Sequence, residues 1–260
     1  MTNTNATHGS FVWFDLLTRD PPAAAAFYAQ VIGWTAQPFE GSGGSYTLFV
    51  GSAGPLGGVA ELPERSRKTG VPPHWTSNVY VDDVDATAAE ARRLGGRVLV
   101  EPSDFPNVGR LAVLADPQGV PINIFKPRDP MKLHDQTTPG EINWCELVAT
   151  DHESAFAYYA RLFGWKRGRD FDMGPMGKYL IYGVGDRDLG GMFTKPSEVP
   201  VPMWVYYIQV ESLGAAMERA RAKGAKVMMG PLEVPGGAHI AQLMDPQGAA
   251  FALHESAKDA

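Results

Sequence analysis

The stretch "LADPQG" at residues 114–119 returns as "LMDPQG" at residues 243–248, 129 residues further along a chain of 260. Aspartate, proline and glycine in this order are typical of a tight turn, because proline presets its own backbone dihedral and glycine accepts a positive φ. A turn that recurs by chance would have unrelated surroundings. Here the surroundings also recur, so we interpret the stretch as part of an internal duplication.

The six tryptophans support this interpretation, since each belongs to a pair at nearly the same spacing. The spacing is 131 residues for two pairs and 129 for the third: Trp13 and Trp144, Trp34 and Trp165, Trp75 and Trp204. The phrase "FYAQVIGW" is likewise answered by "YYARLFGW". We therefore expect a first domain at residues 10–127, a proline-containing linker at residues 128–140 and a second domain at residues 141–257.

Composition limits the classes of function. Hydrophobic residues make up 44% of the chain, which is enough for globular cores. The net charge of −6 argues against nucleic-acid binding, and no apolar run is long enough to span a membrane. A single cysteine, Cys145, and a polar start without a signal peptide favour a cytoplasmic protein. We expect a monomer or a dimer whose partner is a small molecule.

Each half is predicted to contain the order strand, helix, strands twice. Asp20 followed by Pro21 predicts the start of a helix that runs toward Gly33, and Asp151 and Gly164 hold the same places in the second half. Short runs rich in aromatic and aliphatic residues, separated by glycine-containing turns, predict the strands. The expected fold class is α+β.

The order of elements, together with the phrases "FYxxxxGW", "VDDVDA" and "LADPQG", resembles the vicinal oxygen chelate superfamily. This superfamily includes glyoxalases, bleomycin resistance proteins and extradiol dioxygenases. The resemblance covers nearly the whole chain and implies tandem glyoxalase-like domains, each built from two paired βαβββ modules that form a cupped sheet. It implies a glyoxalase-type lyase or a dioxygenase if the protein is an enzyme, but the same fold also serves metal-free drug binders.

Metal-dependent members of the superfamily place His, Gln or Glu at three or four points that line the cup. In this sequence those points fall mainly on residues that are poor metal ligands: Trp13, Thr76 and Asn123 in the first half, Trp144, Val205 and Ala252 in the second, with Glu61 or Thr194 at the remaining point. We therefore expect no metal and no other cofactor. A displaced divalent metal site at His74, joined by Asp15 or Glu61, stays open as an alternative.

The motif W-x-[DE]-L occurs once in each half. Because side chains alternate along a strand, Trp13 and Asp15 share a face, as do Trp144 and Glu146. A buried carboxylate is unfavourable unless it is paired, so each acid needs a partner. That partner is either a ligand or a group inside the protein, such as backbone amides or Arg110.

The same alternation predicts the other residues of the cup. We expect the ligand-binding residues to be Trp13, Asp15, Thr76, Asn78, Asn123, Trp144, Glu146 and Tyr207, without assigned catalytic residues or metal ligands. The predicted function is the binding of a small molecule in a metal-free aromatic cup. A metal-dependent lyase or dioxygenase with a displaced metal site is the alternative.

Overall fold

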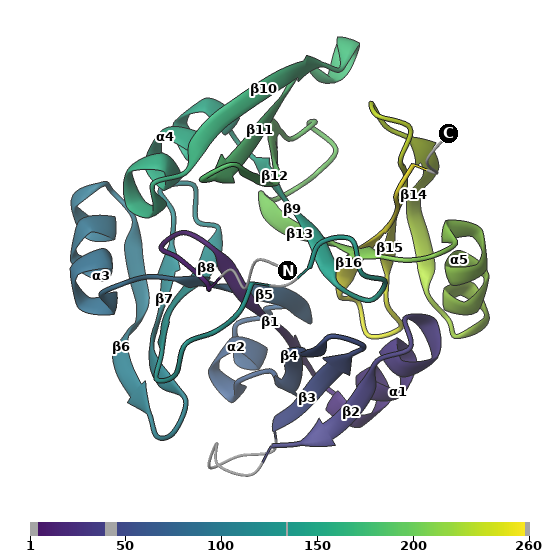
Figure 1. The fold of residues 1–260 in the computed structure, drawn as a ribbon, viewed down its shortest axis with the longest axis horizontal. Helices are drawn as coiled ribbons and strands as arrows, with labels where there is room; N and C mark the ends of the chain where they lie inside the picture. The colour runs from purple at the N-terminus through teal and green to yellow at the C-terminus, as the bar shows by residue number, and fades with distance from the viewer. Residues whose placement is uncertain (1–4, 40–45, 134, 258–260) are drawn as a thin grey trace. The chain divides into compact units, whose positions relative to one another are not determined.

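The computed structural model describes residues 5–39, 46–133 and 135–257, so His134 of the expected linker lies outside the described residues. Within them the chain forms two mixed sheets of eight strands, one from each half, with helices packed against them (Figure 1). The predicted α+β class and the internal duplication are confirmed. No helix among the described residues is both long and apolar enough to cross a membrane.

The first sheet has the strand order β2-β3-β4-β1-β5-β8-β7-β6. Strand β1 is parallel to β4 and β5 is parallel to β8, while the hairpin neighbours are antiparallel. The strands are β1 (Phe11–Thr18), β2 (Thr35–Pro38), β3 (Tyr46–Gly51), β4 (Gly54–Glu61), β5 (His74–Tyr80), β6 (Arg97–Phe105), β7 (Gly109–Ala115) and β8 (Pro121–Pro127), and the helices of this half are α1 (Pro21–Val31), α2 (Glu64–Lys68) and α3 (Val84–Arg93).

The second sheet repeats this order as β10-β11-β12-β9-β13-β16-β15-β14. Every strand of the first sheet has its counterpart eight strands later, which is the structural form of the sequence repeat. The strands are β9 (Ile142–Ala149), β10 (Lys166–Asp172), β11 (Lys178–Val184), β12 (Arg187–Thr194), β13 (Met203–Gln209), β14 (Lys226–Glu233), β15 (His239–Met244) and β16 (Ala250–Glu255), with α4 (His152–Phe163), α5 (Leu213–Ala222) and a 3-10 turn, η1 (Gly174–Met176).

The helix boundaries follow the predicted caps. The Asp20 carboxylate accepts a hydrogen bond from the amide of Ala23 at 3.0 Å and so caps α1, as predicted. Helix α1 ends at Val31, slightly before Gly33, whose φ of +95° lies beyond the helical turn. In the second half Asp151 caps α4, which ends at Gly164 in the left-handed conformation, again as predicted.

The compact units of the chain do not coincide with its two halves. One unit combines Thr76–Leu133 with Trp144–Trp204 and also contains the residues up to Trp13. The other combines Phe14–Trp75 with the residues from Val205 on and with part of the linker. Each unit therefore pairs a module of one half with a module of the other. Helices α3 and α4 lie side by side in the first unit, and α1 and α5 in the second (Figure 1).

The first DPQG turn connects two modules through its buried aspartate. One carboxylate oxygen of Asp116 accepts hydrogen bonds from the amides of Gln118 (2.9 Å) and Val120 (2.8 Å), which fixes the turn. The other oxygen accepts the hydroxyl proton of Tyr159 on α4 at 3.1 Å. Burial raises the pKa of Asp116, and these hydrogen bonds act in the opposite direction. The turn is thus held to a helix of the other half.

The glutamine of the same turn holds the start of that helix. The side-chain oxygen of Gln118 accepts hydrogen bonds from the amides of Thr150 (2.6 Å) and Asp151 (3.0 Å). Its side-chain nitrogen donates to the carbonyl of Asp151 at 2.6 Å. The amide group of Gln118 therefore replaces a strand-like partner for the residues that lead into α4.

The second turn has the same contacts in the other unit. Tyr28 of α1 donates its hydroxyl proton to Asp245 at 3.2 Å. The oxygen of Gln247 accepts hydrogen bonds from the Thr18 hydroxyl at 2.6 Å and the Asp20 amide at 2.9 Å, and its nitrogen donates to the Asp20 carbonyl. The repeated DPQG turn therefore serves one purpose twice: it anchors a helix start that belongs to the other half.

The substitutions Tyr159→Phe and Tyr28→Phe should each lower the free energy of unfolding by about 1–3 kcal/mol, because each leaves a buried carboxylate oxygen without its hydroxyl donor. Urea unfolding followed by circular dichroism measures this loss. Tyr158→Phe is the matched control, since the buried Tyr158 hydroxyl has no hydrogen-bond partner in the described structure and its removal should change stability little. Equal losses for Tyr158→Phe and Tyr159→Phe would contradict the proposed contribution of the aspartate contact.

Candidate functional site

The carboxylate of Asp15 is paired with a tyrosine. Strand β1 places Asp15 beside Gly58 of β4 in parallel register. Tyr46 of β3 donates its hydroxyl proton to Asp15. A Cβ atom at Gly58 would overlap the Tyr46 ring, so the glycine leaves the space in which the ring lies against the sheet. The strand pairing and the glycine together hold the hydroxyl at the acid.

The second half contains the same pair in a more buried form. Tyr179 of β11 donates its hydroxyl proton to Glu146 of β9 at 2.8 Å, and only 6% of Glu146 is exposed. The indole nitrogen of Trp144 donates to the Tyr179 oxygen at 2.8 Å. Gly191 of β12, the register partner of Glu146, again provides the space for the ring. We refer to Asp15 with Tyr46, and to Glu146 with Tyr179, as the two tyrosine–acid pairs.

The tyrosine–acid pairs give each acid an internal partner, but not the expected one. Arg110 binds Asp85 at 2.7 and 2.8 Å and Asp104 at 3.0 Å, so the prediction that it pairs with a strand carboxylate is wrong. The tyrosines were missed although the sequence signals them, because Tyr46 and Tyr179 recur with the spacing of the two LGG motifs. Whether a ligand also contacts Asp15 and Glu146 stays a prediction.

Three other predicted residues come together on β5 and β8 of the first sheet. Asn78 and Asn123 are direct neighbours in the parallel register, and the Asn78 amide donates to the carbonyl of Trp13 at 3.5 Å. Thr76 lies on the same face of β5 as Asn78. All three polar side chains are buried. They form an amide-rich patch beside the first motif tryptophan.

Tyr207, the remaining predicted residue, is buried on β13 opposite Ala252 of β16. Its hydroxyl accepts a hydrogen bond from the side chain of Gln242 at 2.8 Å. It therefore contributes a wall and a satisfied hydroxyl, and the structure brings it together with neither Trp144 nor Glu146.

A histidine-centred cluster on β9, β13 and β16 was not predicted. His254 Nδ1 lies 2.6 Å from the side-chain oxygen of Gln209 and 2.9 Å from the side-chain nitrogen of Asn143. The Ser256 hydroxyl also donates to Gln209, at 3.2 Å. Burial lowers the pKa of His254 and so favours the neutral imidazole. Neither Asn143 nor the final strand carries a periodic signal that marks this cluster in the sequence.

The residues at the superfamily's metal positions do not fit a divalent metal. Trp13, Thr76 and Asn123 offer no imidazole or carboxylate, and Glu61 is ion-paired with Arg67 at 2.5 Å. His74, the centre of the displaced alternative, has its Nδ1 2.8 Å from the carbonyl oxygen of Pro72. Among the described residues no three His, Cys, Asp or Glu side chains gather closely enough to hold an ion. The expectation of a metal-free protein stays a prediction.

Stability should fall as the pH drops below about 6.5, the usual pKa of histidine in an unfolded chain. Between that value and the lowered pKa of His254, the unfolded state binds a proton that the folded state does not, so the free energy of unfolding falls by up to about 1.4 kcal/mol per pH unit. Urea unfolding at several pH values measures this slope. His254→Gln should flatten it, whereas His239→Gln, a change at an exposed histidine, should not. An unchanged slope in His254→Gln would contradict the role of burial.

Two family models match successive parts of this structure. The first is described as a glyoxalase-like domain and matches residues 11–125. The second is described as the glyoxalase/bleomycin resistance protein/dioxygenase superfamily and matches residues 141–253. Each match covers one of the two sheets, so both halves are glyoxalase-like domains.

Curated relatives align along nearly the whole chain. A protein of Mycobacterium tuberculosis (strain CDC 1551 / Oshkosh) named "Putative glyoxylase CFP32" is 28% identical over 243 residues, which cover 93% of this chain and 92% of that protein. A protein of Streptomyces sp. (strain C5) named "Anthracycline biosynthesis protein DauV" is 30% identical over 266 residues, which cover 97% of this chain and 95% of that protein. The tandem arrangement is therefore shared by whole proteins.

Solved structures agree on the fold. The Mn(II)-bound glyoxalase from Novosphingobium aromaticivorans matches with a TM-score of 0.69 at 15% identity, covering 98% of this chain and 84% of that one. At this identity the likeness concerns the fold alone. From the two domain matches and the full-length relatives, the chain belongs to the glyoxalase/bleomycin resistance protein/dioxygenase superfamily, as a tandem of two domains.

Proposed function

We propose that the protein binds a small aromatic molecule without a metal, and that the two tyrosine–acid pairs are the polar anchors for it. The observation that carries the proposal is the identity of the residues at the superfamily's ligand positions. Tryptophan replaces the usual first imidazole in both halves, at Trp13 and Trp144. A divalent ion needs several converging oxygen or imidazole donors, whereas an aromatic ligand needs flat apolar surface with few polar groups.

The chemistry around each motif tryptophan supports this kind of ligand. Trp13 and Trp144 are partly exposed, so each leaves indole surface that can contact another ring. A carboxylate follows two residues later on the same strand face, and a carboxylate accepts about four hydrogen bonds, more than one tyrosine hydroxyl supplies. A phenol or a cationic group on the ligand would complement it. Aromatic and cationic compounds are therefore the proposed ligand class.

The names of relatives agree with an aromatic ligand. One relative is named for the biosynthesis of anthracyclines, which are planar aromatic compounds, and the second family model includes bleomycin resistance proteins in its description. These names describe the relatives, and they guide the choice of probe for this chain. A planar hydroxyanthraquinone combines the ring surface and the phenol that the proposal requires.

A metal-dependent lyase or dioxygenase is the second candidate, because dioxygenases and a Mn(II)-bound glyoxalase share the fold. This candidate would need a displaced metal site. The contacts of His74 with Pro72 and of Glu61 with Arg67 engage the side chains that such a site would use. The metal-free proposal is therefore preferred.

In the test, tryptophan fluorescence of chelator-treated protein is titrated with the hydroxyanthraquinone and with a panel of aromatic cations. Saturable quenching is expected. Asp15→Asn and Glu146→Gln should each weaken binding at their own site by about 1.5–3 kcal/mol, the range of a hydrogen bond to a charged group. Both variants should remain folded, because an amide side chain can still accept the tyrosine hydroxyl proton.

Asp85→Asn is the matched control, since Asp85 is an exposed acid whose partner is Arg110 and whose loss should leave affinity unchanged. A lower melting temperature with unchanged affinity in Asp15→Asn and Glu146→Gln would show that the acids are structural only. Binding that appears only after a divalent metal is added would favour the second candidate.

A further inference from the structure

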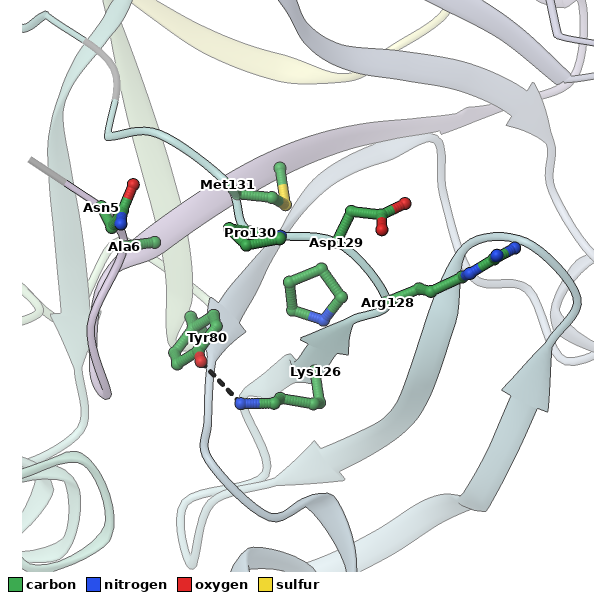
Figure 2. A pocket seen from close by; sticks show the side chains of 9 residues that line it. Asn5, Ala6, Tyr80, Lys126, Arg128, Asp129, Pro130 and Met131 are labelled. Atoms are coloured by element: carbon green, nitrogen blue, oxygen red, sulfur yellow. Dashed lines mark hydrogen bonds between the residues drawn. The ribbon is translucent and has the colours of Figure 1, made fainter. Parts of the chain in front are cut away.

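A small cavity of about 250 Å³ lies at the ends of β5 and β8. Its walls come from three segments that are distant in the sequence: the N-terminal residues Asn5 and Ala6, the end of β5, and the chain that leaves β8. The amide of Ala6 donates to the carbonyl of Met131 at 2.8 Å, and Asn5 forms an isolated bridge with Lys132, which closes one side. Figure 2 shows the lining side chains.

The polar groups of this cavity are hydrogen-bond donors. Lys126 is only partly exposed, and its ammonium donates to the Tyr80 hydroxyl oxygen at 2.6 Å and lies 4.8 Å from the centre of the Tyr80 ring (Figure 2). An ammonium has three N–H donors, and a hydroxyl that accepts one of them still has its own proton to give. No acceptor for the Tyr80 proton is present in the part of the chain that the structure describes.

The positive charge is not neutralised within the described residues. Neither Lys126 nor Arg128 forms an ion pair there, although the chain as a whole has a net charge of −6. Arg128 donates to the side-chain oxygen of Asn107 at 2.9 Å and extends away from Lys126 (Figure 2). The carboxylate of Asp129 also points away from Lys126 (Figure 2). A partly buried ammonium without a counter-ion favours an anion beside it.

The remaining lining is apolar. Pro127, Pro130 and the thioether of Met131 face the same space as Tyr80. A cavity of this volume lies below the range typical of drug-sized ligands, so it fits a molecule with one small ring. We propose that this cavity binds a small monocarboxylate with an apolar body, whose carboxylate accepts hydrogen bonds from Lys126 and Tyr80.

The second half carries no such site, so one carboxylate should bind per chain. The repeat aligns Lys126 with Glu255 and Arg128 with Ala257, 129 residues later. Glu255 instead accepts a hydrogen bond from the Leu213 amide at the start of α5, at 2.6 Å. The two halves have thus diverged in charge at this position. The site is separate from the tyrosine–acid pairs and does not rest on the proposed function.

The test uses benzoate as the probe for the full-length protein, with isothermal titration calorimetry and proton NMR. Benzoate should bind with a stoichiometry of one, and the neutral isostere benzamide should bind at least tenfold more weakly. Lys126→Gln should raise the Kd of benzoate about 10- to 100-fold, and Tyr80→Phe about tenfold, the ranges for hydrogen bonds to a charged group. Lys132→Gln and Asp15→Asn are the matched controls and should leave the Kd unchanged.

Thermal unfolding of each variant checks that the fold is kept, and Lys126→Gln retains an amide donor for the Tyr80 oxygen. The proposal is overturned if benzamide binds as tightly as benzoate, if Lys126→Gln has the same Kd as the parent, or if benzoate does not saturate. Inorganic phosphate that binds as tightly as benzoate would also overturn it, since the apolar walls would then contribute nothing.

Discussion

The buried aspartate of the DPQG turn is the constraint on which the rest of the structure depends. Asp116 and Asp245 each bind their own turn through backbone amides and a helix of the other half through a tyrosine hydroxyl. Burying a carboxylate is unfavourable unless every oxygen is satisfied, so the turn forms in this way only when the helix is in place. The two repeats of this contact give each compact unit a module from each half, and they account for the strict recurrence of four residues 129 positions apart. The paired indoles act in the same sense: Trp34 donates to the carbonyl of Gly140 and Trp165 to that of Gly9, each at 2.8 Å, so the loop before one domain's first strand is held by the other domain's helix end.

This mutual bracing explains why the candidate site can depart from the superfamily's metal positions without loss of the fold. The helices and turns are fixed outside the strand faces that carry Trp13 and Trp144, so those faces are free to change. What they carry instead is repeated in both halves: an indole, an acid two residues later, a tyrosine from the neighbouring hairpin, and a glycine that leaves space for the tyrosine ring. The more buried acid, Glu146, has the more complete set of partners, since the Trp144 indole donates to the same tyrosine. That order follows from the higher cost of a buried charge.

Sequence periodicity was sufficient to predict the duplication, the α+β class and the helix caps, because each depends on local residue chemistry that recurs. The contacts that cross between modules were harder to predict. The need of Asp15 and Glu146 for a partner followed from burial, but the choice of Arg110 was wrong, since Arg110 is claimed by Asp85 and Asp104, and the register that brings Tyr46 and Tyr179 to the acids is set by hairpin pairing. The cluster around His254 and the Lys126 cavity were missed for the opposite reason: both occur in one half only, so a search for repeats passes over them. Tyr207 faces its predicted strand partner but does not meet the acid of its own half.

The central claim is that ligand binding in this protein uses indole, tyrosine and carboxylate groups in place of a metal. The most direct measurement is the metal content of the protein, purified without chelator and measured by elemental analysis alongside its binding of the hydroxyanthraquinone. The account predicts saturable binding by protein that contains far less than one transition-metal ion per chain. About one iron, nickel, manganese or zinc ion per chain, lost together with ligand binding in His74→Ala, would contradict it.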